Sequence, residues 1–183
     1  MKNNIGLFLA KRAHISPNVE AYVDADTRVR YTFAELNARC NQAAHALTKS
    51  GVQRGDRVAL LMMNGNEFVE AYFAIAKIGA IIVPLNWRLV ADELSFILKD
   101  SGSTTLIYGG HFANVVQTLH AAGADSTHIK SWIHVGDDDT RDDFAQEYKA
   151  LLDATSQEEP LAEAASDAML YMIATPGTQD PPY

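Results

Sequence analysis

Strand-like and helix-like segments alternate along the chain, and this order constrains the possible folds more than any other feature. Short apolar runs, typical of strands buried on both faces, are separated by longer segments whose apolar residues recur every three or four positions. The expected strands are residues 58–62, 80–83, 104–108, 132–135 and 169–173. Parallel strands need crossover connections, which helices normally supply. The sequence therefore predicts an α/β protein with three αβα layers and a largely parallel sheet.

Helices are expected at residues 6–13, 33–47, 66–78, 91–99 and 112–122, and a hairpin at residues 21–31. The second helix has the clearest start signal, because Thr32 and Glu35 have the spacing of a capping box. Gly51 is expected to end this helix. Its apolar stripe includes Cys40, which is therefore expected to be a buried packing residue rather than a nucleophile.

Negative charge is concentrated in one late segment. The 183-residue chain has a formal net charge of −8, from 15 basic and 23 acidic residues. Residues 137–167 contain eleven acids and two bases, a net −9, which leaves +1 for the rest of the chain. We expect this segment to lie at the surface. Its acidic runs at 137–139 and 142–143 could bind a cation, but a solvated linker is favoured because they lack the spacing of a calcium loop. The chain also lacks the basic patch that a nucleic-acid partner would require.

Several other classes of protein are disfavoured by the residues present. One cysteine, Cys40, excludes a disulfide framework within the chain, and the six histidines lack metal-site spacing, so no metal ligand is assigned. The first residues do not form a secretory signal, and the longest apolar region, residues 71–85, is interrupted and too short to cross a bilayer. These features predict a soluble cytoplasmic protein with no transmembrane segment.

Two short segments could bind phosphate. After the expected strand 169–173, Thr175, Gly177 and Thr178 form a small hydroxyl- and glycine-containing loop, which could wrap a phosphate or could be a C-terminal tail. Arg88, after the strand 80–83, could also receive a phosphate. Alternatively, Arg88 could pair with Asp92 or Glu93 while the neighbouring tryptophan covers the sheet edge. The residues alone leave both pairs of interpretations open.

A series of segments in order resembles the opening portion of the AMP-forming acyl-CoA synthetases, the adenylate-forming ligases. The resembling segments are YTFAELN at 31–37, GVQRGDRVA at 51–59, NGNE at 64–67, AYFA at 71–74, and KIGA at 77–80 continuing to VPLNWRL at 83–89. The resemblance extends from about residue 4 to residue 178. It implies that residues 1–183 are the N-terminal part of an adenylation domain, with the remainder of that domain and a C-terminal lid absent.

The resemblance also implies a chemistry. Members of this family activate a carboxylic acid with ATP and Mg²⁺, which gives an acyl-adenylate and pyrophosphate, and then transfer the acyl group to coenzyme A. By this resemblance, Thr175, Gly177 and Thr178 would contact the nucleotide phosphates, and Arg88 would contact a coenzyme A phosphate. The substrate expected from the family is a fatty or aromatic carboxylate.

The chain departs from the family within the phosphate loop. Pro176 replaces a serine, Gln179 a threonine, Asp180 a glycine and Tyr183 a lysine. One inserted nucleotide after the first two bases of the Thr178 codon would restore the family's pattern, so a frameshift is one hypothesis for the departure. We expect this chain alone not to be a competent ligase. The alternatives are a non-catalytic domain that folds, binds partners or self-associates through exposed sheet surface, and a stand-alone nucleotide-binding domain.

Overall fold

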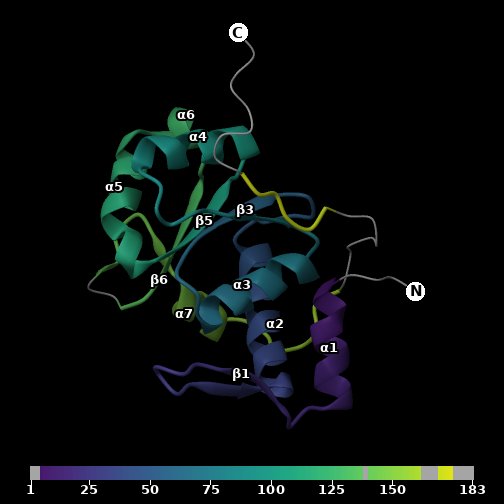
Figure 1. Cartoon of the computed structure of the whole chain (residues 1–183). Helices are drawn as coiled ribbons and strands as arrows, with labels where there is room; N and C mark the ends of the chain where they lie inside the picture. The colour runs from purple at the N-terminus through teal and green to yellow at the C-terminus, as the bar shows by residue number, and fades with distance from the viewer. Residues whose placement is uncertain (1–4, 138–139, 162–168, 175–183) are drawn as a thin grey trace.

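A five-stranded parallel sheet forms the centre of the protein (Figure 1). The computed structural model describes residues 5–137, 140–161 and 169–174. The strand order is β4-β3-β5-β6-β7, and every pair of neighbours is parallel. The strands are β3 (Arg57–Leu61), β4 (Ile81–Pro84), β5 (Thr105–Gly109), β6 (Ser131–Val135) and β7 (Gln146–Glu147). The predicted parallel α/β sheet is confirmed.

Helices cover both faces of this sheet, as Figure 1 shows. Along β3, Val58 and Leu60 pack against one face, while Ala59 and Leu61 pack against the other. The first face is covered by α2 (Phe33–Lys49), α3 (Asn66–Lys77) and α7 (Tyr148–Asp153). The second face is covered mainly by α4 (Ala91–Ser101) and α5 (Ala113–Ala121), with η1 (Gly110–Phe112) and α6 (Ala124–Thr127) beside them. The three layers follow from strands that are apolar on both sides.

The N-terminal part forms a smaller unit beside this core. Helix α1 (Ile5–Ile15) packs against α2 and α3, and β1 (Glu20–Val23) pairs antiparallel with β2 (Arg30–Thr32). The capping box is present: Glu35 N–H donates to Thr32 Oγ1 at 3.3 Å, and Thr32 N–H donates to Glu35 Oε2 at 2.8 Å. Gly51 follows α2 with φ +95°, a conformation that favours glycine.

The acidic segment expected at the surface over 137–167 has a folded middle portion that contributes side chains to the core. Residues 146–153 form β7 and α7, and the side chains of Ala145, Tyr148 and Leu152 are buried. Tyr148 and Leu152 are four positions apart on α7 and form its apolar stripe, whereas Ala145 precedes β7 and packs on the other face of the sheet. The surrounding acidic residues hide this stripe when only net charge is considered.

The expected strand at 169–173 is reduced to a single parallel bridge between Tyr171 and Ile82 of β4. Ile82 N–H donates to Leu170 O at 3.0 Å, and Met172 N–H donates to Ile82 O at 2.8 Å. The next donor along β4 would be Pro84, which has no N–H. The ladder therefore cannot continue in this direction.

Within the described residues, no helix has the length and apolar character needed to span a membrane.

Candidate functional site

The segment around Tyr171 and the turn after β4 meet at one edge of the sheet. Because Tyr171 and Ile82 pair in parallel, the residues that follow each of them leave the sheet at the same end. In parallel α/β proteins, ligands bind at the carboxyl ends of the strands. The turn at residues 85–89 and the described residues up to Ala174 therefore lie at the edge where a ligand is expected.

The turn after β4 is built by local hydrogen bonds. Leu85 N–H donates to Leu60 O at 2.9 Å, which ties the start of the turn to β3. Asn86 Oδ1 accepts Arg88 N–H at 3.1 Å, and Asn86 O accepts Leu89 N–H at 3.2 Å. Asparagine at this position therefore closes the turn with both its side chain and its backbone.

Arg88 projects from this turn onto its neighbour. Its guanidinium carbon lies 4.3 Å from the centre of the Trp87 ring, and both residues are exposed. Within the described part of the chain, Arg88 forms no ion pair with Asp92 or Glu93, so that interpretation is wrong. Glu93 instead accepts Val90 N–H at 3.0 Å, at the start of α4. A stacked guanidinium keeps its N–H donors available to an anion.

The candidate phosphate loop falls outside the described residues. Thr175, Gly177 and Thr178 begin directly after Ala174, the last described position. The structure therefore describes the segment that leads into this loop but not the loop itself. The Met172–Ile82 hydrogen bond is its last described attachment to the sheet.

A cavity of about 320 Å³ lies between the β1–β2 turn and the start of α3, and sequence reasoning did not predict it. It is lined by the β1–β2 turn and the start of α3, and its charged lining residues are Asp24 and Asp26. Hydrogen bonds from Thr27 hold the pKa of Asp24 below its usual value. Two carboxylates make this cavity a poor site for phosphate. The cavity forms because residues 22–26 and residues 64–69, which are distant in sequence, lie close together in the fold. No local sequence signal indicates this proximity.

Cys40 is confirmed as a packing residue. Its side chain is fully buried in a cluster with Leu9 and Leu36. Burial raises the pKa of the thiol, so the reactive thiolate is disfavoured. No group of histidine, cysteine or acidic side chains in the described ranges is arranged to hold a metal ion.

Glu70 is the least expected buried group. It is fully buried on α3, and its carboxylate pairs with the guanidinium of Arg39 on α2. Asn66 Nδ2 also donates to Glu70 Oε1 at 3.3 Å. Burial raises the pKa of Glu70, and Arg39 opposes this shift. The partners satisfy the carboxylate within the helix layer, so its role is structural.

Comparison with known proteins shows which family this chain belongs to. A family model described as "AMP-binding enzyme" matches residues 9–179, which is most of the chain. The chain belongs to the AMP-binding enzyme family. This confirms the resemblance inferred from residues 31–89.

The relatives in the AMP-binding enzyme family include carboxylate–CoA ligases. The long-chain-fatty-acid–CoA ligase FadD13 of Mycobacterium tuberculosis is 41% identical over 179 residues, which are 98% of this chain and 34% of FadD13. The 3-oxocholest-4-en-26-oate–CoA ligase of Rhodococcus rhodochrous is 34% identical over 155 residues, which are 82% of this chain and 27% of that ligase. This chain thus spans about a third of the length of such relatives.

A solved AMP-binding enzyme has the same fold. The inhibitor-bound N-terminal domain of FACL13 from Mycobacterium tuberculosis superimposes with a TM-score of 0.85 at 42% identity. The match covers 97% of this chain and 42% of the solved chain. The parallel sheet and its two helix layers are therefore those of an N-terminal domain of an acyl-CoA ligase.

Proposed function

We propose that residues 1–183 are the N-terminal part of the adenylation domain of an AMP-forming acyl-CoA synthetase. The observation that carries this proposal is the 41% identity to a fatty-acid–CoA ligase over 98% of the chain. In the complete enzyme, a carboxylate oxygen attacks the α-phosphorus of ATP, and pyrophosphate leaves. The thiol of coenzyme A then attacks the acyl carbon, and AMP leaves as the thioester forms.

The proposed contributions of this chain are contacts to phosphate. Thr175, Gly177 and Thr178 would donate hydroxyl and amide hydrogen bonds to the phosphates of ATP. Arg88 would bind a phosphate of coenzyme A, which its exposed guanidinium and lack of an ion pair with Asp92 or Glu93 support. The described residues include no acidic cluster suited to Mg²⁺, so no Mg²⁺ ligand is assigned to this chain.

The proposed substrate is a fatty or aromatic carboxylic acid, and the proposed location is the cytoplasm. The relatives act on acids of different kinds, since their names include a long-chain fatty acid, ferulate and a sterol acid. This variety supports a carboxylate as the feature that the substrates share. Which acyl group is accepted depends on the residues that select it.

We propose that the 183-residue chain does not turn over by itself. The test is pyrophosphate release with ATP, Mg²⁺, coenzyme A and either palmitate or ferulate, measured alongside full-length FadD13 as the positive control. We expect release from FadD13 and none from this chain. Steady release that depends on the added acid would contradict this proposal.

Titration calorimetry with ATP and Mg²⁺ distinguishes the proposal from a stand-alone nucleotide-binding domain. We expect no saturable one-to-one binding by the isolated chain, because it spans about a third of its relatives. One-to-one binding that is lost in Thr178→Ala would favour the stand-alone domain.

A second candidate function is a non-catalytic domain that self-associates. The observation that favours it is the exposed row Met169, Tyr171 and Ile173, with 57, 50 and 59% exposure. These side chains alternate with Leu170 and Met172, which pack onto the core. Sedimentation velocity at 10 to 300 μM tests it: concentration-dependent dimers that Tyr171→Lys abolishes would support it, and a monomer throughout would exclude it.

A further inference from the structure

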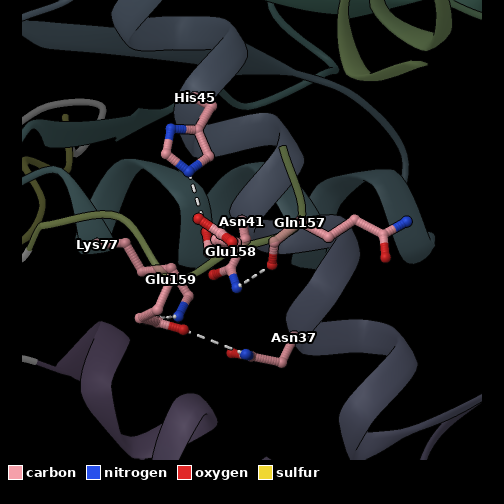
Figure 2. A network of polar contacts seen from close by, with 7 residues as sticks. All are labelled: Asn37, Asn41, His45, Lys77, Gln157, Glu158 and Glu159. Atoms are coloured by element: carbon pink, nitrogen blue, oxygen red, sulfur yellow. Dashed lines mark hydrogen bonds and ion pairs between the residues drawn. The ribbon is translucent and has the colours of Figure 1, made fainter. Parts of the chain in front are cut away.

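An extended segment of the late acidic region lies along α2 and is held there almost entirely by side chains. We call residues Thr155–Glu159 the strap, and Figure 2 shows its last three residues, Gln157, Glu158 and Glu159. Thr155 Oγ1 donates to Gln42 O at 2.9 Å, and Asn41 Nδ2 donates to Gln157 O at 2.9 Å. The contacts join residues more than 110 positions apart in sequence. The strap is thus a long-range feature of the fold.

Three polar residues of α2 hold the strap because they share one helix face. Asn37, Asn41 and His45 are spaced by four positions, as Figure 2 shows. His45 Nε2 lies 2.9 Å from Glu158 O, and Asn37 Nδ2 donates to Glu159 Oε2 at 3.2 Å. Each of the three side chains contacts a different strap residue. Together they define one position of the strap along the helix.

Lys77 fixes the end of the strap from a buried position. It is the last residue of α3, its side chain is 1% exposed, and its ammonium pairs with Oε1 of Glu159. Both carboxylate oxygens of Glu159 are therefore engaged, one by Lys77 and one by Asn37. On the other side, α1 packs directly on the lysine at Gly6. The ammonium is enclosed, and Glu159 is its ion-pair partner.

Lys77 is buried and Glu159 is partly exposed, so the effect of this ion pair on the position of the strap differs from its effect on the free energy of unfolding. Taking an ammonium out of water is costly, and a buried ion pair seldom exceeds the stability of a well-packed apolar side chain. Methionine is unbranched, like the buried part of lysine, and would keep the space between α1, α2 and α3 filled. Glu159 is 37% exposed and could return to water. Loss of the lysine charge would then free Glu159, the end of the strap, without opening the core.

We propose that Lys77 is a positioning residue, whose charge fixes the strap on α2 and so sets where the chain enters the phosphate-loop segment. Two contacts attach this part of the chain to neighbouring elements. Glu159 binds Lys77 at the end of α3, and Tyr171 pairs with Ile82 of β4. Lys77 and Ile82 are only five positions apart. The link to the phosphate loop rests on the proposed function, whereas the position of the strap does not.

The test is native-state cleavage of the Glu158–Glu159 bond by a glutamyl endopeptidase, with products identified by mass spectrometry. The variants are Lys77→Met, Glu159→Gln and the double substitution. Lys149→Met is the matched control, because it removes the exposed Lys149–Asp153 ion pair from α7. Lys77→Met is the primary variant, since both strap glutamates remain for the protease.

We expect cleavage of this bond to be about tenfold faster in Lys77→Met and Glu159→Gln, and unchanged in Lys149→Met. The double variant should cleave no faster than Lys77→Met, because both substitutions remove the same interaction. The urea midpoint of Lys77→Met should equal or exceed that of the parent. Amide exchange in β3 and β5 should be unchanged.

A smaller effect is expected further along the chain. Exchange of the Met172 amide should rise less than cleavage of the strap, because Met172 N–H donates to Ile82 O and this hydrogen bond is separate from the Glu159 anchor. The effect should therefore decrease from the strap to the bridge to the sheet.

Two results would overturn the proposal. The first is an unchanged cleavage rate in Lys77→Met, and the second is a rise in cleavage matched by the same rise in exchange across β3 and β5. If Lys77→Met does not fold, Glu159→Gln decides, since it changes the more exposed partner. ATP binding is measured separately, so a failure of the proposed function leaves the cleavage result interpretable.

Discussion

Gly6 of α1 lies so close to Lys77 of α3 that a Cβ atom on Gly6 would be 2.8 Å from Lys77 Cγ and 2.9 Å from Lys77 Cα. Real Cβ atoms do not approach backbone atoms this closely, and the Lys77 backbone is fixed within α3. The absence of a side chain at residue 6 therefore lets α1 pack on α3. The helix contact and the buried ammonium depend on the same close approach.

Gly6→Ala should consequently destabilise the protein. In an unconstrained helix, this substitution stabilises by about 1 kcal/mol through helix propensity. Here the clash with Lys77 should reverse the sign and lower the free energy of unfolding by about 1–3 kcal/mol. Urea denaturation followed by circular dichroism measures the change. Lys11→Ala, at an exposed position of α1, is the control and should change stability by less than about 0.5 kcal/mol. A stabilised Gly6→Ala variant would show that α1 does not pack this closely.

Leu152→Ala tests whether the acidic region is part of the core. Leu152 is 2% exposed and packs under α2 with Tyr148. Removing its branched side chain should cost about 2–5 kcal/mol of unfolding free energy, as for a large-to-small change in a packed core. The exposed Lys149→Ala on the same helix is the matched control. Equal, small effects of the two substitutions in urea denaturation would mean that α7 does not contribute to the core.

The sheet could be predicted from the sequence because its strands carry a strong local signal. Val58–Leu61 is apolar without interruption, and Thr32 with Glu35 marks the start of α2 through neighbours three positions apart. These features depend on residues close in sequence, which periodicity and capping rules address directly.

The features that were missed depend on contacts between distant segments. Helix α7 was hidden because acidic residues surround its short apolar stripe, and β7 has only two residues. The strap could not be predicted, since the partner of Lys77 is 82 positions away. Arg88 was identified as a candidate, but its stacking on Trp87 and its lack of a pair with Asp92 or Glu93 required the structure.

Glu35→Gln should change how stability depends on pH. Hydrogen bonds from the Thr32 amide and hydroxyl hold the pKa of Glu35 below its usual value of 4.5. Because the folded-state pKa is the lower one, the carboxylate stabilises the protein above pH 4.5, and this contribution is lost as pH falls through the folded-state pKa. The parent should exceed Glu35→Gln in stability at pH 7, and the difference should shrink toward pH 3. Urea denaturation from pH 3 to 7 measures it, and a difference that does not vary with pH would contradict it.

Arg88→Ala should weaken binding of coenzyme A if the turn after β4 meets a phosphate. Trp87 reports this event, because the guanidinium lies 4.3 Å from its ring centre and an anion on Arg88 would alter the emission of the indole. Loss of one charge-assisted hydrogen-bonding group should raise the dissociation constant about 10- to 100-fold. The measurement is a fluorescence titration with coenzyme A at low ionic strength, where phosphate contacts are strongest.

Two comparisons separate a specific contact from general attraction by positive charge. Arg88→Lys keeps the charge but loses the planar fork, so it should bind more weakly than the parent and more tightly than Arg88→Ala. Arg57→Lys is a control at a guanidinium already occupied by Ser101 O and Gly102 O, and it should leave the titration unchanged. Pantetheine, which has no phosphate, should not distinguish the parent from Arg88→Ala. Equal affinity of the parent and Arg88→Ala for coenzyme A would remove Arg88 from the proposed site and leave the Asn86 turn with a structural role.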